Sequence, residues 1–117
     1  MKVLNPHRAT LNGCLLVGLV MFCASSRAAT DADAATAMLK KSECLKCHAI
    51  DKDKKAPSFR NISDKWRGKA DAEAKLIECL TKAPRVKHRD GTLERHKLIA
   101  TTNMSEIRNL VAWIQSQ

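Results

Sequence analysis

The chain has 117 residues, with 21 lysines and arginines against 12 aspartates and glutamates, for a formal net charge of +9. This length suits one domain, and a basic surface can attract nucleic acid, an anionic membrane or an acidic protein partner. Aromatic side chains make up only 3% of the residues, which argues against nucleic acid as the partner.

The first 28 residues have the pattern of a secretory signal peptide. A basic start is followed by an apolar run over residues 13–24 and by small residues at Ser26 and Ala28, the two positions that a signal peptidase reads. The apolar run is too short to span a membrane, so we expect no stable membrane anchor after cleavage. The signal contains three basic and no acidic residues, which leaves an exported, periplasmic domain over residues 29–117 with a net charge of +6.

The N-terminal half of this domain predicts one helix and one irregular segment. Residues 34–44 contain neither Gly nor Pro, and Asp31 or Asp33 can cap the helix, which we expect to run into the cysteines that follow. Residues 49–69 are charged and are expected to be irregular. Potential helix breakers interrupt this segment at Pro57, Asn61 and Gly68.

Two further helices are expected in the C-terminal half, separated by a basic loop. The first covers residues 71–82, with Asp71 as its cap and Pro84 after its end. Residues 85–102 form the loop, which contains an Asp90-Gly91 turn and no convincing strand. The terminal helix covers residues 105–115. It is predicted by the apolar stripe Ile107, Leu110, Val111 and Ile114 and by a capping box formed by Asn103 and Glu106.

Cys44-Leu45-Lys46-Cys47-His48 is the motif that identifies a cofactor. Two thiols at this spacing can form thioethers with the two vinyl groups of one porphyrin, and the next histidine then lies beneath the iron. The spacing is typical of c-type haem attachment, with His48 as the proximal iron ligand. The sequence therefore predicts one covalent haem c bound through Cys44 and Cys47.

Three other interpretations of the motif are weaker. A thioredoxin-like dithiol belongs in an alternating strand and helix pattern, which is missing around these cysteines. A structural zinc site needs four ligands, and Cys79, His88 and His96 form no second close pair in the sequence. A Cys44–Cys47 disulfide leaves His48 without a role. Cys79 is expected to be a small buried apolar residue.

In its motif and its terminal helix the chain resembles the class I (monohaem) cytochrome c family. The similarity rests on Cys44, Cys47 and His48, on Pro57, and on the segment 110–114 around Trp113. The resemblance implies an all-α fold, a small cytochrome c fold with three to four helices around one covalent haem. It also implies that the Pro57 carbonyl receives the His48 ring N–H, and that Trp113 helps the terminal helix pack on the first helix.

The distal iron ligand is where the chain departs from this family. Members usually carry a Gly before the proline, here Ala56, and a distal Met, often followed by Pro, in the loop before the last helix. No Met-Pro occurs here, and the expected position falls at His96 or Lys97. His96 is the first candidate, and Met104 is the alternative. His88 and an iron without a distal protein ligand remain open.

Two functions follow from these alternatives. Two strong axial ligands leave only outer-sphere electron transfer, which makes the protein an electron carrier rather than an enzyme, acting alone or as the small haem subunit of an oxidoreductase. An open or displaceable distal site would instead bind NO, CO or O2. A redox partner with an acidic docking surface is expected to meet the lysines near the motif. These are Lys46, Lys52, Lys54 and Lys55.

Overall fold

The computed structural model describes residues 29–117, and the predicted signal peptide over residues 1–28 lies outside them. The helices are α1 (Ala32–Lys41), η1 (Cys44–Lys46, a 3₁₀ turn), α2 (Phe59–Trp66), α3 (Ala72–Lys82) and α4 (Met104–Gln115), and the strands are β1 (Arg85–Lys87) and β2 (Leu93–Arg95). In this part of the chain, no helix has the length and apolar character needed to cross a membrane.

Helix α1 is shorter than predicted and does not run into the cysteine motif. It begins at its cap Asp31, whose side chain accepts a hydrogen bond from the Ala34 N–H at 2.9 Å, and it ends at Lys41. Glu43 then adopts a left-handed conformation, with φ of 57°, that a continuing helix does not allow. Because no glycine marks this left-handed turn in the sequence, the prediction placed the end of the helix too late.

Helix α2 lies in the segment that was predicted to be irregular. Ser58 caps it by accepting a hydrogen bond from the Asn61 N–H at 3.1 Å, and Phe59, Ile62 and Trp66 face the core at helical spacing. The expected breaker Pro57 precedes the helix and Gly68 follows it, with φ of +73°. These residues delimit a short helix instead of preventing one.

Helix α3 matches its prediction, whereas the basic loop that follows contains two unpredicted strands. Ala83 ends α3 in a left-handed conformation with φ of 47°. Strands β1 and β2 then pair antiparallel in the register Arg85 with Arg95 and Val86 with Glu94. The turn between them contains Gly91, whose φ of +87° favours glycine. Each strand has three residues and little apolar alternation, so periodicity did not indicate them.

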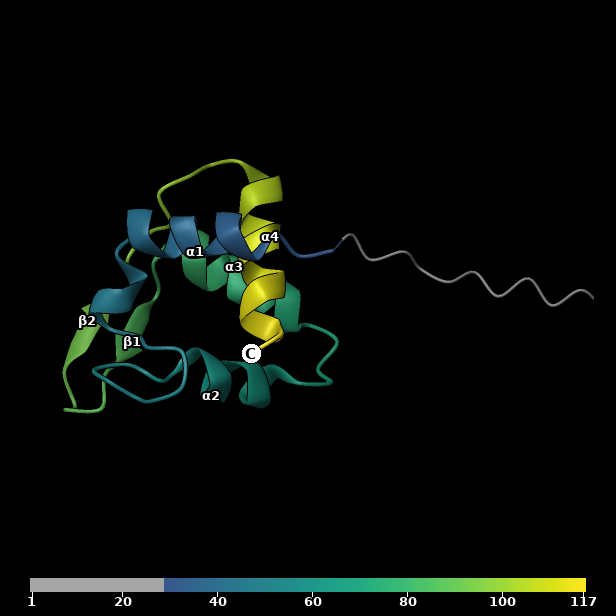
Figure 1. Cartoon of the computed structure of the whole chain (residues 1–117). Helices are drawn as coiled ribbons and strands as arrows, with labels where there is room; N and C mark the ends of the chain where they lie inside the picture. The colour runs from purple at the N-terminus through teal and green to yellow at the C-terminus, as the bar shows by residue number, and fades with distance from the viewer. Residues whose placement is uncertain (1–28) are drawn as a thin grey trace, which may run out of the picture.

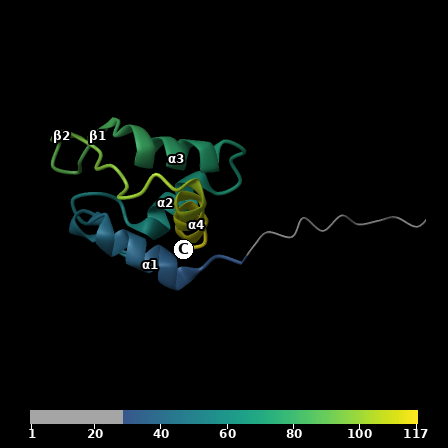
Figure 2. The same ribbon diagram turned by 90° about the horizontal axis from the view of Figure 1, so that it is seen from above.

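Helix α4 is the central element of the core, and its prediction is largely confirmed. It packs against α1, α2 and α3 (Figure 1), and Figure 2 shows α1 and α3 on opposite sides of it. Asn103 caps it by accepting a bond from the Ser105 N–H at 2.9 Å. The predicted capping box is incomplete, because Glu106 binds the Thr101 hydroxyl and not the Asn103 N–H. All four residues of the predicted apolar stripe are buried: Ile107, Leu110, Val111 and Ile114.

Candidate haem-binding site

The turn after α1 brings both motif thiols and the following imidazole to one cavity. In η1 the Cys44 carbonyl accepts hydrogen bonds from the N–H groups of Cys47, at 3.2 Å, and His48, at 3.0 Å. This tight turn places Cys44, Cys47 and His48 along the wall of the same cavity. Backbone hydrogen bonds within the motif therefore set the relative positions of its thiols and imidazole, so the residue spacing alone indicates the site.

His48 is held in one orientation by contacts on two sides. Its Nδ1–H donates to the Pro57 carbonyl at 2.6 Å. Its ring stacks on Phe59, with centroids 5.1 Å apart, and Phe59 in turn meets the edge of Trp113 at 5.5 Å. The Pro57 bond leaves Nε2 as the nitrogen that can bind a metal. Phe59 was not identified from the sequence, although an aromatic residue directly after Pro57-Ser58 is a usable signal.

The electrostatic surroundings of His48 favour a neutral imidazole. Burial is the largest effect and lowers the pKa of His48, while the Pro57 carbonyl opposes it and His96, His88 and Lys54 lower the pKa further. A histidine must be neutral at one ring nitrogen to act as a metal ligand. Burial thus prepares His48 for this role at neutral pH.

His96 lines the same cavity as His48. Its ring Nδ1–H donates to the Lys97 carbonyl at 2.9 Å, and its backbone N–H donates to the Pro84 carbonyl at 2.8 Å, at the base of the hairpin. The centroids of the two imidazole rings are 6.3 Å apart. Two metal–nitrogen bonds of about 2.0–2.1 Å, with the distance from each nitrogen to its ring centre, span about 6 Å. The spacing therefore fits a single metal ion between them.

The other two distal candidates, His88 and Met104, are less suitable as ligands. His88 also lines the cavity, but its Nε2 lies 3.3 Å from a Glu94 carboxylate oxygen. Met104 occupies the first turn of α4, is 42% exposed, and is not among the residues that line this cavity. Of the distal candidates, His96 is the one whose free nitrogen and position both suit the iron.

The cavity between the two histidines has the size and lining of a cofactor site. Its volume is about 560 Å³, within the range of about 300–1,000 Å³ typical of such sites. The walls are mainly apolar and come from α1, α2, α3 and α4, and the hairpin adds charged side chains at one edge. The apolar residues lining it are Leu39, Phe59, Ile62, Trp66, Leu76, Leu80, Leu110 and Ile114.

Comparison with known proteins identifies the group to which this fold and site belong. The cytochrome c family model matches residues 32–117. This chain is a member of the cytochrome c family. The class 1 cytochrome MtoD of Sideroxydans lithotrophicus ES-1 is 46% identical to it, with a TM-score of 0.72, and the match covers 75% of this chain and 97% of MtoD.

A more distant structural relative supports the fold of this cytochrome. Wild-type cytochrome c552 of Nitrosomonas europaea is 23% identical, with a TM-score of 0.54, over 74% of this chain and 98% of that protein. No curated protein sequence matches the chain. The predicted all-α cytochrome c fold and its resemblance to class I monohaem members are confirmed, and the cofactor of this cytochrome is covalent haem c.

The three thiols of residues 29–117 are similarly exposed, but two belong to the attachment motif and the third belongs to α3. Cys44, Cys47 and Cys79 are half-buried and form no disulfide with one another. Burial is the largest effect on Cys44 and Cys79 and raises the pKa of both thiols, which suppresses their thiolate form. Cys79 lines the cavity from α3. No three or more Cys, His, Asp or Glu residues within 29–117 gather into a metal-binding group.

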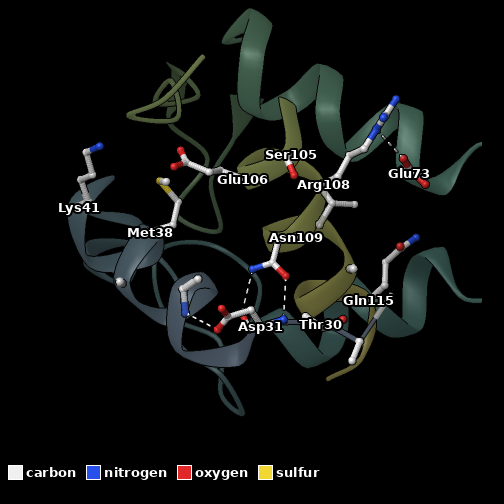
Figure 3. Close-up of a pocket in the computed structure, with 15 residues that line it drawn as sticks. Thr30, Asp31, Met38, Lys41, Glu73, Ser105, Glu106, Arg108, Asn109 and Gln115 are labelled. Carbon is white, nitrogen blue, oxygen red and sulfur yellow. Dashed lines mark hydrogen bonds and ion pairs between the residues drawn. The ribbon is translucent and has the colours of Figure 1, made fainter. Parts of the chain in front are cut away.

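A second, larger hollow lies on the outside of this cytochrome, between the start of α1 and α4. Its volume is about 830 Å³, and Figure 3 shows its lining. Asp31 and Asn109 are joined there by two hydrogen bonds of 2.8 Å, which tie the start of α1 to α4. No cysteine or histidine lines this hollow. Its lining therefore offers no group for haem attachment, in contrast to the smaller cavity with Cys44, Cys47 and His48.

Proposed function

We propose that this cytochrome is an exported, periplasmic single-electron carrier whose one haem is attached through Cys44 and Cys47 and ligated by His48 and His96. The observation that carries the proposal is the pair of imidazoles in the wall of one cavity, with ring centroids 6.3 Å apart and ring planes tilted by 49°. Both rings use Nδ1 to bind a backbone carbonyl. Each therefore keeps Nε2 for the iron.

Two imidazole ligands determine what the site can do. The haem supplies an iron that changes oxidation state by one electron. With both His48 and His96 as its ligands, a bound haem would have no position left for a substrate and would only exchange electrons. Imidazole in place of methionine also lowers the reduction potential. Pro57 fixes the tautomer of His48, and the mainly apolar wall would limit the contact of a bound haem with water.

An optical experiment on the purified holoprotein tests this ligation. We expect low-spin spectra in both oxidation states, without the charge-transfer band of methionine ligation, and no change when CO is added to the reduced protein. The reason is that strong-field ligands occupy both axial positions. A high-spin resting spectrum, or a spectrum that shifts with CO, would instead favour the alternative function, a haem protein that binds small ligands such as NO, CO or O2.

The lysines expected to meet a partner are mostly engaged within the protein. Lys46 pairs with Glu43 at 2.5 Å, and Lys55 pairs with Glu94 at 2.7 Å. Lys54 donates to the Leu45 carbonyl at 2.6 Å. Exposed pairs of this kind reduce the positive charge that a partner meets. The lysines around the motif are therefore weaker candidates for docking than the sequence indicated.

The hairpin is the better candidate for the docking surface. Arg85 and Arg95 lie opposite each other in the two strands, and like charges in such positions repel. Arg85, Lys87 and Arg95 are exposed, and no carboxylate of residues 29–117 forms an ion pair with any of them. Lys87 and Arg95 also lie at the cavity edge. An acidic redox partner would neutralise this cluster next to the haem.

Charge reversal at the hairpin should change the rate of electron exchange with charged inorganic reagents. For the double variant Lys87→Glu/Arg95→Glu at low ionic strength, we expect oxidation by ferricyanide to slow about three- to tenfold and reaction with a cationic cobalt complex to accelerate. The control is Lys41→Glu/Arg108→Glu, which makes the same change of net charge in the hollow of Figure 3. Equal effects from both double variants would contradict a local docking surface.

A further inference from the structure

The two sides of the haem cavity are joined directly by a set of side chains that we call the bridge: Asp53, Lys55, Arg89 and Glu94. Arg89 Nη1 lies 2.7 Å from Asp53 Oδ2, and Lys55 Nζ lies 2.7 Å from Glu94 Oε1. The Arg89 N–H also donates to the Lys55 carbonyl at 3.3 Å. These contacts connect the loop that follows His48 to the hairpin that precedes His96.

On the proximal side, the bridge is anchored next to the residues that orient His48. Asp53 Oδ1 accepts hydrogen bonds from the Ser58 N–H at 2.7 Å and from the Asn61 side chain at 2.8 Å. Ser58 directly follows Pro57, the carbonyl partner of the His48 ring. Asp53 therefore belongs to a loop that is fixed by hydrogen bonds both to the proximal imidazole and to the start of α2.

On the distal side, the bridge is anchored to the hairpin that positions His96. The turn is closed by the His88 N–H, which donates to the Thr92 carbonyl at 2.8 Å, and the Asp90 side chain accepts from the Thr92 N–H at 2.9 Å. Glu94 precedes His96 by two residues, and its other carboxylate oxygen lies 3.3 Å from His88 Nε2. The segment with His96 is thus tied to the proximal loop through one rigid turn.

The charges of the bridge favour its own contacts. The Ser58 N–H, followed by the Asn61 side chain, lowers the pKa of Asp53, with Arg89 acting in the same direction. In the second pair, Glu94 raises the pKa of Lys55, and Lys55 lowers the pKa of Glu94. These directions favour the charged forms of Asp53 and Lys55, and the two ion pairs themselves are shown by their distances of 2.7 Å.

We infer that Asp53, Lys55, Arg89 and Glu94 are positioning residues that hold the segment with His96 against the haem cavity, and that they limit how fast an external ligand replaces His96 at the iron. The inference rests on the proposed function, because it takes His96 as the distal ligand. The bridge does not bind the iron. It acts through the hairpin, by making the displacement of His96 from the cavity less frequent.

The size of the effect follows from the exposure of the pairs. The exposed fraction is 60% for Arg89 and 26% for Asp53, and 37% for Lys55 and 51% for Glu94. Ion pairs this exposed contribute modestly to stability. We therefore expect loss of either pair to raise the rate of ligand replacement about two- to tenfold, with no loss of fold.

Cyanide binding to the ferric holoprotein near neutral pH measures this rate. We expect Arg89→Met and Lys55→Met each to accelerate binding, while their resting spectra stay low-spin. Arg89→Met is informative because it leaves the bonds of Asp53 to Ser58 and Asn61 in place. High salt should accelerate the wild type toward the variants, since it weakens exposed ion pairs and the attacking species, hydrogen cyanide, is neutral.

The matched control is Arg67→Met, which removes the exposed 2.7 Å pair with Asp64 at the end of α2. Unchanged cyanide rates in both bridge variants would overturn the inference, and so would an equal acceleration in Arg67→Met, which would indicate general loosening. A different result would contradict the proposed function. Either the wild type itself would be high-spin, or a variant without the His96 imidazole would keep a low-spin spectrum.

Discussion

Replacement of His96 by alanine is expected to convert the ferric holoprotein from a low-spin to a high-spin spectrum and to make the reduced protein bind CO. Both changes follow from the loss of one strong-field ligand, because His48 keeps its bond to Pro57 and its stacking on Phe59. Alanine leaves space beside the iron that a small ligand can enter. Optical spectra and CO titration of the purified variant measure the two effects.

Added imidazole provides the rescue arm of this experiment, since it should restore the low-spin spectrum of His96→Ala by binding in the space left by the side chain. His88→Ala is the control. Its imidazole is already bound to Glu94, at 3.3 Å, so the spectrum of this variant should match the wild type. A low-spin His96→Ala protein without added ligand would exclude His96 as the distal ligand.

Removal of the two attachment thiols is expected to prevent both covalent pigmentation and cooperative folding. In Cys44→Ala/Cys47→Ala the cavity of about 560 Å³ loses its tethered occupant. At about 24 cal/mol per Å³, a dry cavity of that size would cost on the order of 10 kcal/mol, as an upper limit because this one is partly open. That is comparable with the whole stability of a typical domain, about 5–15 kcal/mol. The domain is also small.

Circular dichroism with thermal unfolding tests the folding of this double variant. We expect little near-ultraviolet signal and no sharp melting transition. Cys79→Ala is the control, since Cys79 lines the same cavity but lies outside the motif, and it should keep both pigment and melting transition. A native-like cooperative transition in the colourless double variant would contradict the role of the haem as part of the core.

Local patterns allowed the sequence to predict part of this structure. The attachment motif is arranged by two hydrogen bonds within its own five residues, from the N–H groups of Cys47 and His48 to the Cys44 carbonyl, so its spacing alone indicated the cofactor. The stripe on α4 was equally direct, because a helix at the centre of the core must be apolar over a wide face. The sequence also selected His96 as the first distal candidate, and the structure places it in the wall of the same cavity as His48. Its role as an iron ligand stays a prediction.

The features that were missed depend on contacts between distant residues. Helix α2 is held by a cap at Ser58 and by packing on α4. Its three apolar residues lie in a short segment between Pro57 and Gly68, two residues that were expected to break a helix. The hairpin is stabilised by side chains from the loop near residue 53, which no local rule detects. The early end of α1 at Lys41 depends on a left-handed Glu43 without a glycine. Tertiary context decided all three.

The packing of α1 on α4 has a consequence for how the molecule is made. These helices come from opposite ends of the domain, so the core cannot close until the last residues of the chain are present. The attachment motif directly follows α1 and is complete much earlier during biosynthesis. A chain that emerges N-terminus first therefore offers its thiols to the porphyrin while the remainder is still unfolded. We therefore expect tethering of the haem to precede the packing of the later helices around it.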